Sequence, residues 1–386
     1  MRIAYVHTGQ WPSNSPSMTF STMTAKALAE TTECCHFFIQ RNSDFSSEEI
    51  FEKYFNLSQP ENLFIYQYHK SNLLNSNHSY FIKVFNKITK LIKDDMLDAV
   101  ISRNATFLPY LACIKKRYNI NVFYETHNFY VDISIRNDLR KKKIKYSICE
   151  KLFIPKISGL ICLQNQQRNI YHKYFPKIKI IVAPSSISNI IKTKIKERKY
   201  LGYIGSFDNH KGISILISAA SQSNTKPDIL IIGGKNEKEI SKILNIASKY
   251  NYQSKVIITG WLKKKQLEEH LKTIKIGIVP LTDTFFNRYL TSPLKLFDFF
   301  SCGIPVISSD LPTMRELIDN GKTGILFEPE NPFDLSQKID IMLSNNNEYN
   351  NMVNSVYSKA EGCLWSHRAS KIINEIKTLP EYNLLK

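Results

Sequence analysis

The chain of 386 residues is long enough to form two domains of ordinary size, each with its own hydrophobic core. Apolar residues make up 43% of it, which excludes a disordered chain, and no uncharged apolar run approaches the ~20 residues that a membrane-spanning helix needs. The formal net charge of +18 favours an anionic partner without choosing between nucleic acid, anionic lipid and a small anionic molecule.

The cysteines and the N-terminal residues bear on the cellular compartment. The number of cysteines, seven, is odd and no C-x-x-C pair occurs, so we expect free, mostly buried thiols in a reducing compartment. The opening residues, MRIAYVHTG, are typical of a strand and lack the apolar segment of a signal peptide. We therefore expect a cytoplasmic protein, either free in solution or bound at the inner face of the plasma membrane.

The first half of the chain alternates predicted strands with predicted helices. A strand at residues 2–7, a loop at 9–17 and a helix at 18–30 are typical of the start of a doubly wound α/β domain. The loop lacks the G-x-G-x-x-G fingerprint, so a dinucleotide cofactor is not supported. Helical spacing of apolar residues predicts a helix at 81–94. The remaining predicted strands of this half cover residues 34–40, 63–67, 97–102, 121–124, 159–163 and 178–183.

Two polar side chains follow predicted strands directly. Arg103 comes after the strand at 97–102, and His127 comes soon after the strand at 121–124. Ligands of open α/β sheets bind at the carboxyl ends of strands, so both residues are candidates for a binding site. The alternatives are a salt-bridged loop arginine and a structural histidine. Glu125 either holds the tautomer of His127 or pairs with a basic neighbour.

A strongly basic helix is predicted from Arg140 to about Phe153. Ile144, Ile148 and Leu152 recur every four residues and form one apolar stripe, and the other faces are rich in lysine. Our expectation is that the stripe packs on the protein and the lysines are solvated. The alternative is that this helix lies on an anionic lipid surface.

The second half begins after a charged segment at about residues 189–198, where we place the linker. A strand at 200–204 leads into Gly205 and Ser206, and Lys211 lies at the start of the next helix. A glycine turn and a lysine at a helix N-terminus are features that hold phosphate groups, although the spacing is not that of a Walker A loop. Further strands are predicted at 228–232, 255–259 and 276–280.

Residues 289–324 read YLTSPLKLFDFFSCGIPVISSDLPTMRELIDNGKTG. Thr291-Ser292-Pro293 predicts a helix start, with a hydroxyl near the N-cap and the proline in the first turn, and Gly303 predicts its end. The helix is mostly apolar, and a buried strand is predicted at 304–307. Free backbone N–H groups, the helix dipole and Lys295 together predict a phosphate site. The alternative is an ordinary helix with a surface lysine.

This segment resembles the nucleotide-sugar signature of the retaining glycosyltransferases with two Rossmann-like domains, the GT-B type of glycosyltransferase family 4. The runs SPLKLFD, CGIPVI and RELIDNGKTG match that signature nearly residue for residue. The resemblance implies an α/β fold in which two Rossmann-like domains face a cleft. Residues 1–190 would bind the acceptor, residues 198–364 would bind the nucleotide sugar, and a C-terminal helix within 365–386 would cross back to the first domain.

The resemblance also implies an activity and a set of site residues. The reaction is transfer of a sugar, with retention, from a nucleotide-diphosphate sugar to a hydroxyl of a glycan or lipid-linked acceptor, as in cell-surface polysaccharide or glycolipid synthesis. His127 would meet the 6-hydroxyl of the sugar, and Lys211 and Lys295 would meet the diphosphate. Neither a metal nor another cofactor is implied, and no nucleic acid. The implied donor contacts are Gly205, Ser206, Trp261, Ser292, Pro293, Leu294 and Asp298, and those on the acceptor side are Gly9 and Arg103.

The chain departs from the family pattern at one acidic position. Many members place two glutamates eight residues apart; Asp298 stands at the second position and Leu290 at the first. We expect Asp298 to accept hydrogen bonds from the ribose hydroxyls, and the sugar contact of the first acid to be missing or moved to Asp283. Trp261 either flanks the base or packs in the core, and the core is our expectation. A nucleotide-sugar epimerase or hydrolase of the same fold, and a basic polyanion-binding protein, are the alternative functions.

Overall fold

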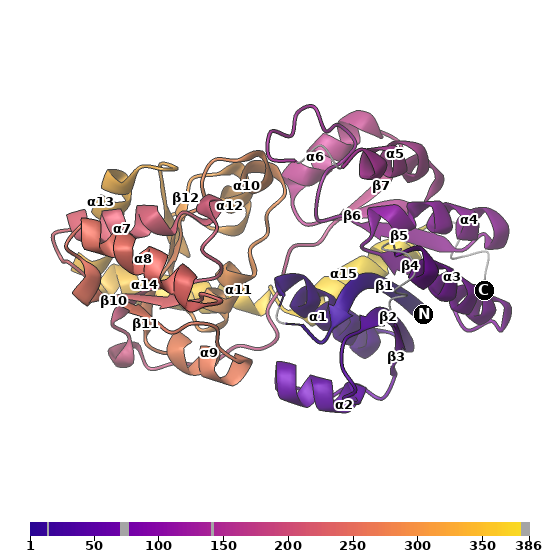
Figure 1. Ribbon diagram of the computed structural model, residues 1–386, viewed down its shortest axis with the longest axis horizontal. Helices are drawn as coiled ribbons and strands as arrows, with labels where there is room; N and C mark the ends of the chain where they lie inside the picture. The colour runs from indigo at the N-terminus through magenta and orange to yellow at the C-terminus, as the bar shows by residue number, and fades with distance from the viewer. Residues whose placement is uncertain (14, 70–76, 140–142, 380–386) are drawn as a thin grey trace. The chain divides into compact units, whose positions relative to one another are not determined.

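The computed structural model describes residues 1–13, 15–69, 77–139 and 143–379, which form two compact units (Figure 1). The first unit runs from Met1 to Pro184 and resumes at Trp365, and the second is Ser185–Leu364. The first unit therefore ends before the predicted boundary at residue 190. The boundary lies there because residue 187 is already paired with the end of the second unit: the Ile187 amide donates to the Cys363 carbonyl (2.9 Å).

The first unit is built on a seven-stranded sheet in the order β3-β2-β1-β4-β5-β6-β7, and every neighbouring pair is parallel. Its strands are β1 (Arg2–Trp11), β2 (Cys34–Arg41), β3 (Leu63–Tyr68), β4 (Ala99–Ser102), β5 (Asn121–Glu125), β6 (Gly159–Cys162) and β7 (Lys179–Val182). Its helices are α1 (Pro16–Thr31), α2 (Ser47–Ile50), α3 (His78–Lys93), α4 (Leu108–Tyr118), α5 (Ile144–Phe153), α6 (Asn165–Tyr174) and α15 (Trp365–Lys377).

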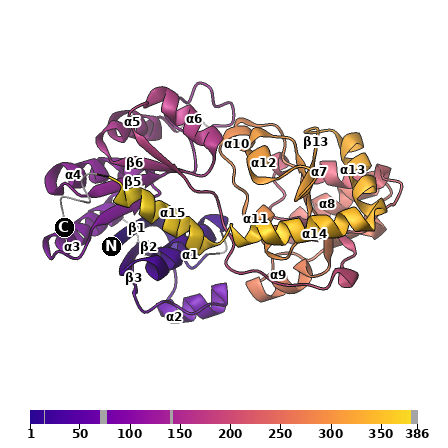
Figure 2. The ribbon, with the colours of Figure 1, turned by 180° about the vertical axis from the view of Figure 1, so that it is seen from behind.

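The last helix returns to the first unit, as the resemblance implied. Helix α15 packs against α1, and Figure 2 shows the two side by side. Strand β1 is longer than predicted, because Gln10 and Trp11 pair with Gln40 and Arg41 after a shift in register. This extension places Gly9 inside the strand, where we had expected the beginning of a loop.

Helix α5 differs from its predicted form in one respect that matters for function. Residues 140–142, which include the predicted start at Arg140, lie outside the described residues. The expectation that the apolar stripe packs on the protein is wrong, because Ile144, Ile148 and Leu152 are 58%, 50% and 54% exposed. In the described part of the chain, no helix combines the length and apolarity needed to cross a membrane.

The second unit repeats the α/β plan with a six-stranded parallel sheet in the order β10-β9-β8-β11-β12-β13. Its strands are β8 (Tyr200–Ile204), β9 (Ile229–Ile232), β10 (Val256–Ile258), β11 (Ile274–Val279), β12 (Val306–Ser309) and β13 (Gly324–Phe327). Its helices are α7 (Ile213–Gln222), α8 (Glu237–Lys249), α9 (Lys264–Leu271), α10 (Phe285–Tyr289), α11 (Leu294–Ser301), α12 (Pro312–Leu317), α13 (Pro332–Ser344) and α14 (Asn346–Glu361).

Helix α11 is the predicted signature helix, and its apolar residues form much of one core cluster. Leu296, Phe299 and Phe300 are fully buried, which fixes the rotation of this short helix about its axis. Its start differs from the prediction, since Pro293 is the N-cap residue and lies before the first turn. The Ser292 hydroxyl does not cap the helix; it accepts a hydrogen bond from the Ser185 amide (3.0 Å).

Candidate functional site

Glycines bring two strand ends of the second unit together. The Gly205 amide, after β8, donates to the carbonyl of Ile232 at the end of β9 (3.0 Å). Gly233 has φ +154°, and a Cβ there would lie 2.1 Å from the Gly205 carbonyl oxygen. A side chain at position 233 is thus excluded by backbone. The close approach leaves bare backbone at the carboxyl edge of the sheet, where ligands of such sheets bind.

Lys211 is held at the same edge by the turn that follows it. Gly212 has φ +68°, and a Cβ there would lie 1.7 Å from the carbonyl oxygen of Pro280, just past β11. Only glycine fits this turn, so the position of Lys211 relative to the sheet is fixed. Burial lowers the pKa of Lys211, and the nearby Asp208 carboxylate opposes that shift. Asp208 also accepts a hydrogen bond from the Ser206 hydroxyl (2.7 Å).

Lys295, one residue into α11, is a buried cation. The residue is 8% exposed, and among the described residues its Nζ has no hydrogen-bond partner. The Nζ lies 3.9 Å from the centroid of the Tyr203 ring, and a Cβ on Gly205 would be 3.4 Å from it. Burial, followed by the charge of Lys211, holds the pKa of Lys295 well below its usual value. The surface-lysine alternative is therefore wrong.

This arrangement has a clear electrostatic meaning. A buried ammonium group that lacks a partner is destabilising, and a bound anion would remove that penalty. The N-terminus of α11 adds unpaired N–H groups and the positive end of the helix dipole at the same place. Lys211, Lys295, the glycine turns and the start of α11 therefore form a site suited to an anionic group with several oxygens.

The other predicted donor contacts of the second unit differ in their exposure and in their partners. The side chain of Asp298 is 25% exposed and faces Lys264 (3.7 Å), and burial raises the pKa of its carboxyl. Trp261 is 46% exposed, so the expected core position is wrong. Leu290 is fully buried, and Asp283 accepts a hydrogen bond from Arg288 (2.9 Å).

The first unit contains a buried carboxylate, Glu125, at the end of β5. It accepts hydrogen bonds from the Tyr5 hydroxyl and from the guanidinium of Arg368 in α15. Arg103 faces it with Nε at 3.7 Å. Burial alone would raise the pKa of Glu125, but the charges of Arg368 and Arg103, together with the neighbouring His127, outweigh it and lower that pKa. Of the two roles expected for Glu125, pairing with a basic neighbour is the one observed.

His127 lies beside this carboxylate without bonding to it. Its Nε2 is 3.8 Å from the Glu125 carboxylate and has no hydrogen-bond partner within the part of the chain that the structure describes. The ring packs edge-on against Phe20 of α1 (4.5 Å between centroids). Burial and the charge of Arg103 lower the pKa of His127 to about 4. The imidazole is therefore neutral near pH 7 and can donate or accept one hydrogen bond.

The two predicted acceptor-side residues are packed into this region. Arg103 donates to the Ser17 carbonyl (2.7 Å) and lies over the Phe20 ring (4.6 Å), and its side chain is 5% exposed. It therefore has the salt-bridged role that we gave as the alternative. A Cβ on Gly9 would lie 2.6 Å from Nε2 of His7, so this glycine makes room for its neighbours.

Three residues of this cluster were missed from the sequence. Phe20 is covered by the guanidinium groups of Arg103 and Arg368, at 4.6 and 4.8 Å from its centroid, and Trp365 packs on its edge at 5.0 Å. Arg368 follows Glu125 by 243 positions, so no local pattern pairs them. The one available signal was an arginine within the otherwise apolar face of the last helix.

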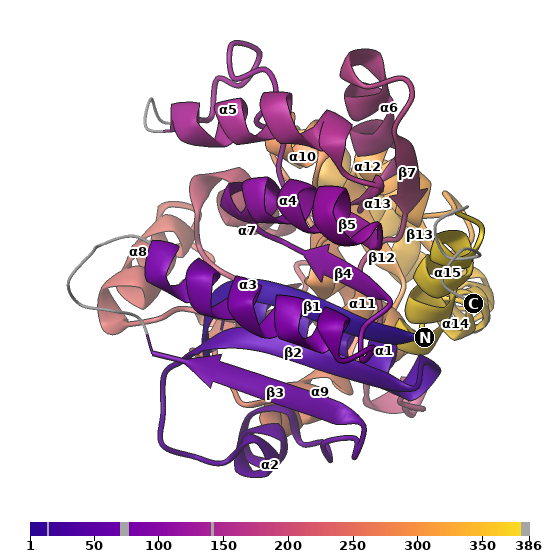
Figure 3. The same ribbon diagram turned by 90° about the vertical axis from the view of Figure 1, so that its right-hand side faces the viewer.

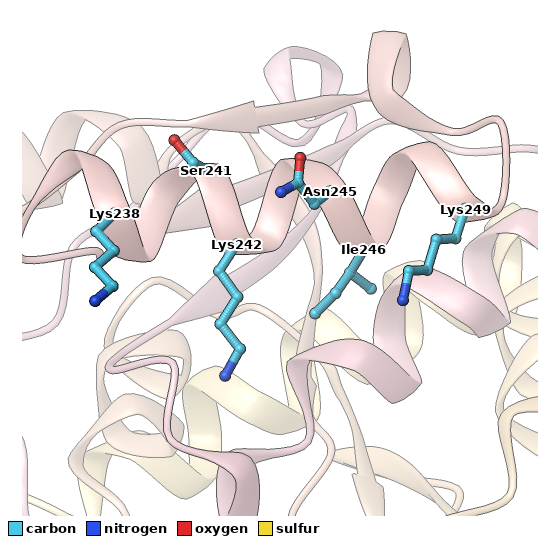
Figure 4. Close-up of a pocket in the computed structure, with 6 residues that line it drawn as sticks. All are labelled: Lys238, Ser241, Lys242, Asn245, Ile246 and Lys249. Atoms are coloured by element: carbon cyan, nitrogen blue, oxygen red, sulfur yellow. The ribbon is translucent and has the colours of Figure 1, made fainter.

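Two other features of the structure carry no assignment. Within the described ranges, no group of three or more His, Cys, Asp or Glu side chains could hold a metal ion. Figure 4 shows a shallow hollow whose lining residues all belong to α8, with Lys238, Lys242 and Ile246 extending to the same side. Residues of one helix alone line this hollow, and it is separate from the site described above.

The second unit is similar in sequence to known glycosyltransferases. Residues 187–359 match the family model described as glycosyl transferases group 1. The chain is also 31% identical, over 136 residues, to the chitobiosyldiphosphodolichol beta-mannosyltransferase of Candida albicans. That match covers 34% of this chain and only 29% of the relative's length.

Solved structures resemble the chain over nearly its whole length. Sucrose-phosphate synthase from Thermosynechococcus elongatus aligns with a TM-score of 0.73 at 14% identity, covering 97% of each chain. HepE of Anabaena, solved with UDP and glucose, aligns with a TM-score of 0.74 at 12% identity, covering 98% of this chain and 100% of that one. At such identities the likeness establishes the fold. Residues 187–359 thus resemble the glycosyl transferases group 1 family, in a chain whose two units have the α/β fold of the GT-B glycosyltransferases.

Proposed function

We propose that this protein is a glycosyltransferase that moves a sugar from a nucleoside-diphosphate sugar to a hydroxyl of a glycan or lipid-linked acceptor. The observation that carries the proposal is Lys295, a buried and unpartnered ammonium group beside the glycine turn at Gly205. The diphosphate of a nucleotide sugar supplies the negative charge and the oxygens that this site lacks in its own described residues. The match of residues 187–359 to the family model of glycosyl transferases group 1 supports the same activity.

In the proposed reaction the bond between the anomeric carbon and the β-phosphate oxygen breaks, and the acceptor oxygen bonds to that carbon. The nucleoside diphosphate takes the electron pair of the broken bond and gains one negative charge, and the acceptor's hydroxyl proton passes to its β-phosphate oxygen as the new bond forms. Lys211, Lys295 and the N-terminus of α11 stabilise that charge in place, without reorganisation of solvent. We propose that no metal is required, since these fixed positive charges already neutralise the leaving group. We also propose retention at the anomeric carbon, in line with the signature that residues 289–324 resemble.

The remaining roles follow from the positions of the side chains. We assign the neutral His127 as a hydrogen-bond partner of the transferred sugar, and Asp298 as the acceptor for the ribose hydroxyls once it leaves Lys264. Trp261, half exposed after Gly260, is assigned to the face of the base. UDP-sugars are the first donors to test, because HepE, which was solved with UDP-glucose, aligns with 98% of this chain. We propose a cytoplasmic site of action.

A thermal-shift screen of the full chain against UDP, GDP, ADP and their sugars tests the proposal. A ligand present at about 100 times its dissociation constant stabilises the folded state by roughly 2.7 kcal/mol. We expect the diphosphate of one base to give this shift and Lys295→Met to reduce it to roughly 0.4–1.4 kcal/mol, as a ten- to hundredfold weaker affinity requires. Lys338→Met is the matched control, because Lys338 forms an ordinary surface pair with Asp334 in the same unit and should leave the shift intact. No shift with any nucleotide would overturn the donor site.

One observation favours a second candidate, a nucleotide-sugar epimerase or hydrolase. The first acidic position of the family pattern is the fully buried Leu290, and Asp283, the proposed substitute, is already paired with Arg288. A missing sugar contact leaves room for chemistry on the donor alone. Consumption of the nucleotide sugar in the absence of any acceptor, followed by mass spectrometry or NMR, would establish this candidate over transfer.

A further inference from the structure

We propose that the outward face of α5 binds the surface of anionic phospholipid membranes. This inference concerns the first unit and goes beyond sugar transfer. Its starting observation is the exposed aliphatic stripe of Ile144, Ile148 and Leu152, each at least half exposed. Exposed aliphatic residues are ordinary when scattered, but three that recur every four residues along one helix form a continuous apolar strip.

The lysines of α5 border this strip on both sides. At about 100° per residue, Ile148 and Leu152 lie roughly 40° and 80° around the helix axis from Ile144. Lys145 lies about 20° beyond Leu152, and Lys151 about 20° before Ile144. These five residues are the exposed positions of the helix. An aliphatic centre with lysines at both edges is the pattern of a helix that lies in a membrane interface.

The opposite face of α5 is fixed to the protein, so the strip cannot turn inward. Glu150 is fully buried and accepts hydrogen bonds from the Tyr130 amide (2.7 Å) and the Tyr171 hydroxyl (2.9 Å). The Ser147 hydroxyl donates to the Val131 carbonyl (3.1 Å). Glu150 is the one acidic residue in the α5 sequence, and its burial leaves α5 with no acidic side chain on its outward face.

The surroundings of α5 add to the positive charge. Helix α4 lies beside α5, as Figure 3 shows, and its last turn carries Lys115, Lys116 and Arg117. Lys156, just past α5, is exposed as well. A nucleic acid or another soluble polyanion would use the lysines and leave the aliphatic strip in water. A membrane with anionic headgroups uses both, because the strip enters the acyl boundary and the lysines reach the phosphates.

The test is flotation of the full chain with vesicles, without any nucleotide sugar. The vesicles contain phosphatidylcholine alone, or phosphatidylcholine with about 30% phosphatidylglycerol. We expect the wild type to float with the anionic vesicles only, and Ile148→Glu to reduce the partition constant at least about tenfold. Ile341→Glu is the matched control, because Ile341 in α13 is also 50% exposed and should float like the wild type. Circular dichroism of both variants checks their fold.

Three results would overturn the proposal. One is a wild type that stays in solution with anionic vesicles, and another is an Ile148→Glu variant that floats as well as the control. The third is a wild-type dimer in light scattering that Ile148→Glu converts to a monomer without any vesicle binding, because the strip would then contact a second copy. Since no donor is present, failure here leaves the nucleotide screen unaffected.

Discussion

Removal of Arg368 should destabilise the first unit strongly. The perturbation is Arg368→Leu, which leaves the carboxylate of Glu125 buried with Arg103 at 3.7 Å as its remaining charged neighbour among the described residues. It also removes the guanidinium that donates to the Pro184 carbonyl (2.9 Å). Breaking a fully buried ion pair by deleting one partner costs about 3–5 kcal/mol. That loss is a large part of the roughly 5–15 kcal/mol that stabilises an ordinary domain.

Urea denaturation followed by tryptophan fluorescence measures this effect. The chain has three tryptophans, and Trp11 and Trp365 lie in the first unit. In a Trp261→Phe background the fluorescence therefore reports on the first unit alone. Arg41→Leu is the control, because the Arg41–Asp44 pair lies in the same unit with its carboxylate in solvent and should contribute at most about 1 kcal/mol. A loss for Arg368→Leu no larger than that of the control would refute the reasoning.

Three further predictions follow from buried or strained positions. Lys295→Met should raise the free energy of unfolding without nucleotide by about 1–3 kcal/mol in urea titrations, because an unpartnered buried cation is removed. Burial raises the pKa of Glu150 to about 7. The contribution of Glu150 to stability is therefore full below about pH 4.5, and on the order of 3 kcal/mol is lost as the pH rises through 7. Glu150→Gln should therefore melt higher than the wild type at pH 8 and equally near pH 4. Gly212→Ala should cost at least about 2 kcal/mol, because its Cβ meets the carbonyl of Pro280, whereas Gly321→Ala, with a similar φ (+79°) and open space, should cost about 1 kcal/mol.

Each of these predictions has a contrary outcome. A Lys295→Met variant less stable than the wild type would mean that the ammonium has a favourable partner in the free protein. Parallel pH profiles of melting temperature for the wild type and Glu150→Gln would mean that Glu150 stays ionised in the native state. Equal losses for the two glycine variants would show that the loop at Gly212 relaxes away from the Pro280 carbonyl.

Local patterns predicted most of the fold. All strands of the two sheets except β13, which was not predicted, appeared near their predicted positions, because buried parallel strands are short apolar runs between turn residues. The mostly apolar α11 was also predicted correctly. The boundary at Pro184 was not, since it depends on the pairing of Ile187 with Cys363, which no local sequence pattern reveals. The N-terminal limit of α11 shifted for a similar reason, because the Ser292 hydroxyl bonds to Ser185.

The candidate site was predictable in part. Lys211 and Lys295 were found because a lysine at a helix start has local meaning, but the burial of Lys295 against Tyr203 depends on tertiary packing. Glu125 was recognised as a possible partner of a basic side chain, and its actual partner, Arg368, comes from the far end of the chain. The same limit applies to α5, where periodicity revealed the apolar strip at Ile148 but not whether it faces the protein or the solvent.

The central claim is that the buried ammonium of Lys295 binds the diphosphate of the donor. Isothermal titration calorimetry of the nucleoside diphosphate selected by the screen, with wild type and Lys295→Met, tests it most directly. Loss of a charge-assisted hydrogen bond should weaken binding about ten- to a hundredfold, while Lys338→Met binds like the wild type. An unchanged dissociation constant in Lys295→Met would contradict the claim and place the anion elsewhere.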